Sequence, residues 1–148
     1  LHLLSRRQRQ MCIRDRQVAA GQNVVFSETP VSGGCNILHR EGAGNVTLRG
    51  ACSQCRARYK ITFGANIAIP TGGTVGPISI AITVDGERLG SSIATVTPAA
   101  VGDEFNVFSA AFVEVPRGCC VTVAVQNASV PAQAIEVQNA NLIVERVC

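Results

Sequence analysis

Short apolar runs, interrupted every few residues by glycine, proline, asparagine or serine, make up the chain from residue 17 onward. None of these runs repeats its apolar residues at the three- and four-residue spacing of an amphipathic helix. Valine, isoleucine, threonine and phenylalanine dominate them, which is typical of β-strands. We therefore predict ten strands: Asn23–Phe26, Cys35–Leu38, Asn45–Arg49, Arg56–Ile69, Ile78–Val84, Glu87–Val96, Glu104–Val115, Cys120–Gln126, Ile135–Val137 and Asn141–Val147.

Residues that favour turns separate the predicted strands. The strongest signal is Asp85-Gly86, because both residue types tolerate the positive φ angles of a two-residue hairpin turn. Many short strands at regular spacing predict an all-β sandwich or barrel.

Two strands differ in their face patterns. The segment Arg56–Phe63 alternates strictly, so its three basic side chains should face solvent or a partner, with Tyr59, Ile61 and Phe63 in the core. In contrast, Phe105–Val113 carries apolar residues on both faces. Such a strand needs a second covering layer, and we expect an interface between subunits, because obligate oligomers have apolar interfaces.

The first sixteen residues differ in composition from the rest of the chain. Five arginines lie in them: Arg6, Arg7, Arg9, Arg14 and Arg16. They could form a basic arm that binds nucleic acid, or a targeting sequence. However, residues 6–16 resemble the forward translation of a transposase-type sequencing adapter. We therefore expect residues 1–16 to be an artefactual, disordered segment that replaces the native N-terminus, and residues 17–148 to form a single domain.

Removing this segment changes the charge. The 148-residue chain has 13 basic and 10 acidic residues, a net charge of +3, which hints at an acidic partner. Without the first sixteen residues, eight basic and nine acidic residues remain, so the argument for nucleic acid disappears.

The length and the 47% hydrophobic content suit one domain with a substantial core. No apolar run reaches the length of about 18 residues that a membrane-spanning helix requires.

Six cysteines remain in the retained chain: Cys35, Cys52, Cys55, Cys119, Cys120 and Cys148. Cys52 and Cys55 have the spacing of a zinc ligand pair, and Cys35 or Cys119 could complete such a site. Adjacent residues of a strand point to opposite faces, however, so Cys119 and Cys120 are poor joint ligands. Three disulfides are another arrangement, but we favour free thiols and expect no metal or cofactor.

Enzymatic signatures are weak. His39 is the one histidine of residues 17–148, and no serine lies in a Gly-x-Ser-x-Gly elbow. No glycine-rich stretch opens a helix to bind phosphate. We expect a protein that is not an enzyme.

Several segments together resemble a known family. They are Arg58–Ile69, Gly76–Glu87, Phe105–Val115, the turn Pro116-Arg117-Gly118, Val121–Val125 and Ala140–Val144. In strand order and turn placement, these segments resemble the tumour-necrosis-factor-like and complement-globular-head jelly-roll superfamily. The likeness is to its bacterial and phage members, such as the C-terminal domains of exosporium collagen-like glycoproteins.

The resemblance implies a ten-strand jelly-roll sandwich of two antiparallel sheets that assembles as a trimer. Candidates for side chains around the threefold axis are Tyr59, Phe105, Phe108 and Phe112. The monomer core is the alternative, which we favour for Tyr59 and for one of the phenylalanines. Where the family commonly has an acidic residue, this chain has Cys119-Cys120, which speaks against calcium there.

We therefore expect a non-enzymatic structural or interaction module, the trimeric head of a phage virion or of a bacterial surface fibre, with a role in adhesion. Its partners would be copies of itself, a host-surface receptor, or capsid and fibre proteins, without nucleic-acid binding or membrane insertion. The alternatives are a carbohydrate- or small-ligand-binding lectin-like domain, a β-sandwich hydrolase built on His39, and a cysteine-ligated zinc domain.

Overall fold

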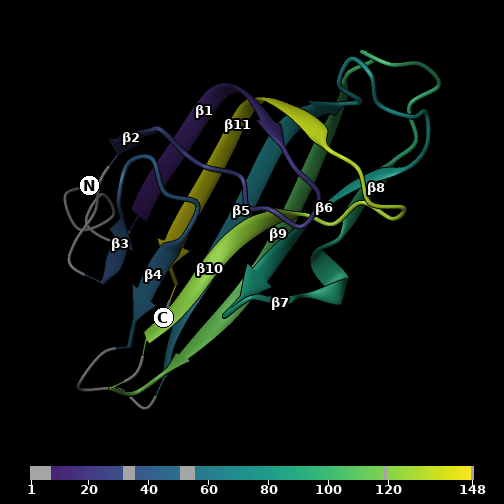
Figure 1. The fold of residues 1–148 in the computed structure, drawn as a ribbon. Coiled ribbons are helices and arrows are strands. Elements are labelled where there is room, and N and C mark those ends of the chain that lie inside the picture. Colours follow the sequence, from purple (N-terminus) through teal and green to yellow (C-terminus); the bar gives the residue numbers. More distant parts are fainter. Residues whose placement is uncertain (1–7, 32–35, 51–55, 119, 148) are drawn as a thin grey trace.

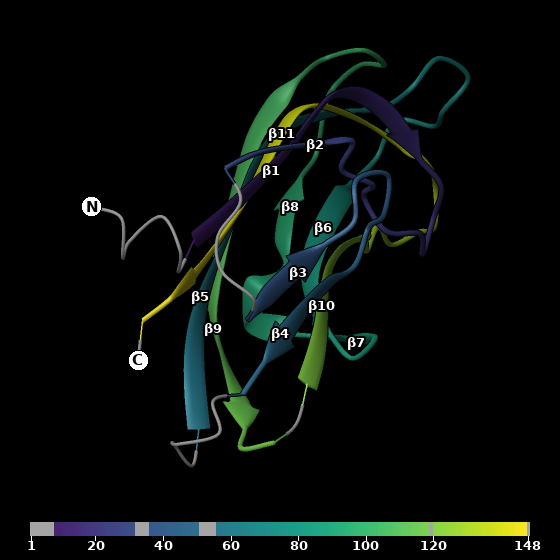
Figure 2. The ribbon, with the colours of Figure 1, turned by 90° about the vertical axis from the view of Figure 1, so that its left-hand side faces the viewer.

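The computed structural model describes residues 8–31, 36–50, 56–118 and 120–147. Two antiparallel sheets pack face to face, and the two layers are seen from the side in Figure 2. The prediction of an all-β jelly-roll sandwich is confirmed.

The first sheet has five strands in the order β2-β1-β11-β5-β9 (Figure 1). Their bounds are β1 Gln8–Val18, β2 Glu28–Val31, β5 Arg56–Ala68, β9 Phe105–Pro116 and β11 Ile135–Arg146. Strands far apart in the sequence are neighbours here, since β11 lies between β1 and β5. This exchange of neighbours is what a jelly roll requires.

The second sheet has the order β3-β4-β10-β6-β7, and β8 also pairs with β6. Its strands are β3 Ile37–His39, β4 Val46–Arg49, β6 Ile78–Val84, β7 Glu87–Arg88, β8 Ala94–Val96 and β10 Cys120–Asn127. A 3-10 turn at Gly90–Ser92 joins β7 to β8. Within the described ranges, no helix is long and apolar enough to cross a membrane.

The hairpin predicted at Asp85-Gly86 is confirmed. Val84 of β6 pairs with Glu87 of β7, and the two residues between them have φ angles of 51° and 87°. Two positive φ angles in a two-residue loop define the turn type whose twist matches that of the flanking strands. The local sequence therefore determines the position of β7.

Other boundaries differ from the prediction. The segment Asn23–Phe26 makes only two isolated bridges instead of a strand. The predicted strand Glu87–Val96 is interrupted because the buried Ser92 hydroxyl accepts from Ile82 N at 2.9 Å and donates to Leu89 O at 2.7 Å. The last two predicted strands form one strand, β11, with an irregularity in register after Gln138.

Residues 8–16, for which we expected disorder, form most of a strand in the structure. They belong to β1, which pairs with β11 from Gln8, opposite Glu145, to Val18, opposite Ile135. Met11 and Ile13 are buried beneath the sheet, and this burial together with the ladder along β11 explains why the segment is ordered. Its adapter origin stays a prediction.

The core lies between the two sheets and is centred on β5. The alternation predicted for this strand is confirmed, because Tyr59, Ile61 and Phe63 are fully buried whereas Lys60 is exposed. The Tyr59 hydroxyl donates to Arg49 O at 2.6 Å, which links β5 of one sheet to β4 of the other. A buried phenol needs such a partner.

Asn127, at the end of β10, is 1% exposed, and its side chain makes four hydrogen bonds. Its amide donates to Val18 O at 3.1 Å and to Gln133 O at 2.8 Å. Its Oδ1 accepts from Ser129 N at 3.1 Å and from Ser129 Oγ at 2.7 Å. One side chain thus joins the end of β1 to the loop before β11.

Replacing Asn127 with alanine should lower the free energy of unfolding by about 2–4 kcal/mol, because several buried polar groups lose their partner together. Urea unfolding measures the change. The matched control is Asn106→Ala, which removes an exposed hydrogen bond to Asn66 and should cost less than about 0.5 kcal/mol. Equal losses in the two variants would contradict a structural role for Asn127.

Limited trypsin digestion tests whether β1 is folded. Arg14 and Arg16 lie within the strand, whereas Arg40 and Arg117 are exposed outside strands. Because a protease needs a locally unfolded backbone, cleavage after Arg40 or Arg117 should come first. The intact masses of the fragments show which arginine is cleaved first. Early cleavage after Arg14 and Arg16 would restore the expectation of disorder.

Candidate interaction surface

The five-stranded sheet has one face turned away from the core, and we call it the outer face. Since Tyr59, Ile61 and Phe63 point inward, the alternate residues of β5 point outward, and strand pairing identifies their neighbours. The central residues of the outer face are Lys60, Thr62 and Gly64 on β5, Phe108, Ala110 and Phe112 on β9, and Asn141 and Ile143 on β11.

Two aromatic side chains dominate this face. Phe108 is 65% exposed and Phe112 is 63% exposed. They lie four residues apart on β9, so both project from the same side, Phe108 opposite Gly64 and Phe112 opposite Lys60. The prediction that this strand is apolar on both faces is confirmed, because Val107 and Val113 point into the core.

Gly64 leaves a gap in the layer of side chains beside Phe108. A Cβ atom at this position would meet no other atom within 4 Å. On the far side of the glycine, β11 contributes Asn141. A glycine inside a strand often marks a place where another chain approaches closely.

Charged residues surround the aromatic pair. Arg58 Nη2 contacts Glu114 Oε1 at 2.9 Å, and the two side chains are about half exposed. An exposed pair of this kind contributes at most about 1 kcal/mol. Lys60, two residues after Arg58 on β5, is also exposed. In the sheet it lies between Phe112 of β9 and Glu145 of β11.

The other aromatic candidates lie elsewhere. Tyr59 is fully buried and therefore belongs to the monomer core rather than to a subunit interface, as we expected. Phe105 is 41% exposed at the start of β9, but alternation puts it on the side of the buried Val107. The structure thus brings Phe108 and Phe112 together and separates Phe105 from them.

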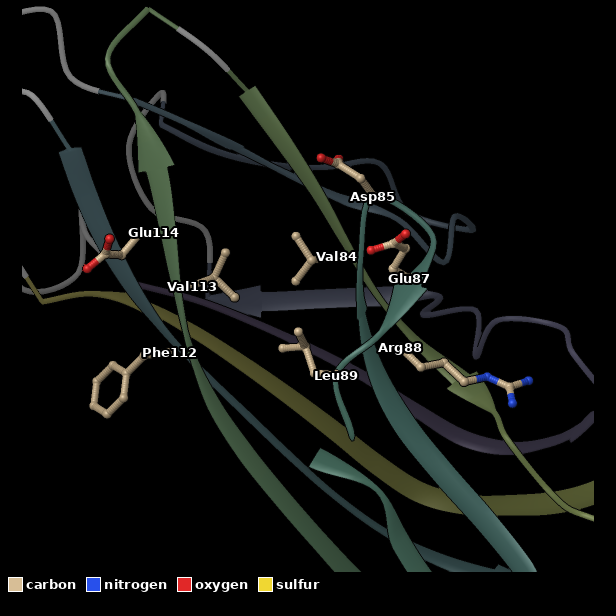
Figure 3. A pocket seen from close by; sticks show the side chains of 8 residues that line it. All are labelled: Val84, Asp85, Glu87, Arg88, Leu89, Phe112, Val113 and Glu114. Carbon is tan, nitrogen blue, oxygen red and sulfur yellow. The ribbon is translucent and has the colours of Figure 1, made fainter. Parts of the chain in front are cut away.

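A groove of about 570 Å³ lies at the open edge of the sandwich, where β9 faces the β6–β7 hairpin (Figure 3). Val84 and Leu89 point toward Val113 of β9, which gives the groove an apolar floor. Phe112 lines both this groove and the outer face, so the two surfaces are continuous.

The groove is bordered mainly by carboxylates. Asp85 and Glu87 come from the hairpin, and Glu114 comes from β9. Asp85 Oδ1 accepts from Thr122 N at 2.9 Å, which fixes this carboxylate at the groove end. The one basic residue of the lining, Arg88, extends away from β9, and its Nε donates to Gln126 Oε1 at 2.5 Å.

Sequence reasoning did not find this groove. It forms between residues 84–89 and 112–114, which meet only because the two sheets place β7 and β9 at the same edge. The one local signal was the Asp85-Gly86 turn, which predicted the hairpin but not what it would face.

The cysteines proposed as zinc ligands, Cys35, Cys52, Cys55 and Cys119, lie outside the described residues. Of the described cysteines, Cys12 on β1 is partly buried and its Sγ donates to Glu28 Oε2 at 3.6 Å, and Cys120 is exposed at the start of β10. Among the described residues, no group of three or more histidine, cysteine or acidic side chains could hold a metal ion.

His39, on β3, contacts neighbouring segments of the fold through both nitrogens of its ring. Its Nε2 lies 3.0 Å from Ala43 O, and its Nδ1 lies 3.0 Å from Thr29 Oγ1. If Nε2 donates to the carbonyl, a neutral ring accepts the threonine hydroxyl at Nδ1. The edge of the ring also packs against Phe26. These contacts tie β3 to the turn that follows it and to β2.

Comparison with known proteins reveals similarity of structure only. No protein-family model and no curated protein matches the sequence. Among solved structures, the Eiger TNF of S. frugiperda has a TM-score of 0.60 at 11% identity, covering 97% of this chain and 94% of the other. The globular domain of zebrafish complement 1qA gives 0.57 at 9% identity, with 96% and 98% covered.

A third similar structure is the PRD1 vertex protein P5, with a TM-score of 0.54 at 13% identity, covering 97% of this chain and 98% of the other. At such low identity the likeness concerns the fold, and it extends over nearly the whole length of each chain. It confirms the resemblance inferred from strand order and turn placement: the chain has the jelly-roll fold of the tumour-necrosis-factor-like and complement-globular-head proteins.

Proposed function

We propose that the chain is a non-enzymatic structural module that associates with copies of itself through its outer face. The observation that carries the proposal is the exposure of Phe108 and Phe112, side by side on one face of a long strand. Apolar patches of this kind on a sheet mark interaction sites. Burial of the two rings would supply the main free energy of association.

The composition of the outer face supports the same proposal. Between the two rings lie small or uncharged residues, Thr62, Gly64 and Ala110, whereas Lys60 lies beside Phe112 at one end of the pair. The charged residues Arg58 and Glu114 stand at its margin, already paired with each other. An uncharged centre with a polar rim is the usual anatomy of a protein interface.

The resemblance in fold favours a trimer over other assemblies. We further propose a place on a virion or on a bacterial surface fibre, which the likeness to a vertex protein supports. A host-surface receptor and capsid or fibre proteins are the partners that such a head would meet.

The main alternative is a carbohydrate- or small-ligand-binding domain that uses the edge groove. Its volume is within the range of ligand sites. Sugar-binding sites depend on aromatic rings, however, and Phe112 is the single aromatic residue of the groove lining. The groove supports this function less well than the outer face supports self-association.

The mass in solution tests self-association directly. The purified chain should have about three times the 15.5 kDa of one copy in light scattering. Phe108→Glu and Phe112→Glu should each shift the mass toward that of one copy, because a carboxylate would replace an aromatic ring at the contact. A monomeric unaltered chain would overturn the proposal.

The matched control is Val75→Glu, which places the same charge on an apolar residue that is 51% exposed in the loop between β5 and β6. This variant should keep the mass of the unaltered chain. Circular dichroism should show the same strand content in all three variants, since each substituted side chain is exposed in the single copy.

Metal analysis tests the cysteine interpretation. Protein purified under reducing conditions should contain no stoichiometric zinc, because Cys52 and Cys55 form the one pair with ligand spacing and a structural site needs four ligands. One zinc per chain, lost together with folded structure on adding a chelator, would identify a zinc domain instead.

A further inference from the structure

The edge groove is chemically unlike the outer face that adjoins it. Its floor is apolar, from Val84, Leu89 and Val113, and its borders carry Asp85, Glu87 and Glu114. Arg88 is turned away toward Gln126, so the side facing β9 is acidic. A long side chain with an apolar stem and a positive end fits such a groove, because the stem covers the floor and the charge meets the carboxylates.

The same chain presents such a side chain on its outer face. Lys60 is exposed, points outward from β5, and lies opposite Phe112 in the sheet. Arg58 is less suitable, because its guanidinium is held by Glu114 of the same copy. Lys60 also has three donors, which can reach both carboxylates of the hairpin border.

We infer that Lys60 of one copy inserts into the groove of the next copy and meets Glu87 and Asp85 of the hairpin, because Glu114 is already paired with Arg58 on the outer face. This inference rests on the proposed self-association and specifies its geometry. Because Phe112 lines both surfaces, a chain seated over the two phenylalanines also reaches the groove.

The charge pattern selects a head-to-tail contact. A twofold contact centred on the groove would bring the carboxylates of two copies together, and like charges across an interface are unfavourable. A contact between the groove of one copy and the Lys60 region of another joins unlike surfaces. Repeated contacts of this type form a ring, as a trimer requires, when the rotation between successive copies allows closure.

Charge reversal tests the inference in the full chain. Lys60→Glu and Glu87→Lys should each raise the dissociation constant of the assembly by roughly tenfold or more, measured by analytical ultracentrifugation at low salt. The double variant, with both changes in one chain, should recover most of the affinity, because the opposite charges again meet between copies. Arg40→Glu, on the exposed residue that follows β3, is the control with the same charge change.

The outcomes separate this inference from the proposed function. If the phenylalanine variants dissociate the assembly but Lys60→Glu and Glu87→Lys leave it intact, self-association stands and the Lys60 contact is wrong. If each single variant weakens the assembly and the double variant does not recover, the two residues do not meet, and the inference fails. A monomer for the unaltered chain overturns both.

Discussion

The residues of β5 point alternately into the core and toward the outer face, and both faces of the first sheet depend on this alternation. Each inward residue of this strand, from Tyr59 to Ile67, is part of the core, so a slip by one residue would expose the core and bury Lys60. The same register fixes what the strand shows outward. It aligns Gly64 with Phe108 and Lys60 with Phe112, so that residues more than 40 positions apart in the sequence lie side by side on the outer face.

The sequence predicts those features that depend on local pattern. The alternation in β5 identified its buried residues, and the Asp85-Gly86 turn identified the hairpin between β6 and β7. The apolar residues on both sides of β9 indicated that this strand has an outer face of its own. In each case the pattern that carries the information lies within about a dozen residues, and the fold did not override it.

Features that depend on distant segments could not be predicted in this way. Ser92 interrupts a strand because its hydroxyl reaches the backbone of β6, ten residues away, and no local pattern shows this. The edge groove requires β7 and β9 to meet, and Phe105 separates from Phe108 because alternation turns the two rings to opposite sides. In β1, Met11 and Ile13 have the two-residue spacing of an inward-facing strand, but the arginine-rich composition around them does not indicate one.

The way β1 is held has a consequence for protein engineering. Its buried apolar contribution consists of Met11, Ile13 and Val18, and the rest of its attachment is backbone pairing along β11. Backbone hydrogen bonds are made by almost any residue, so this position in the sheet imposes a pattern rather than a particular sequence. Strand β1 is therefore a natural place for grafting, where an epitope or a cleavable tag that keeps three inward apolar residues could form part of the sheet.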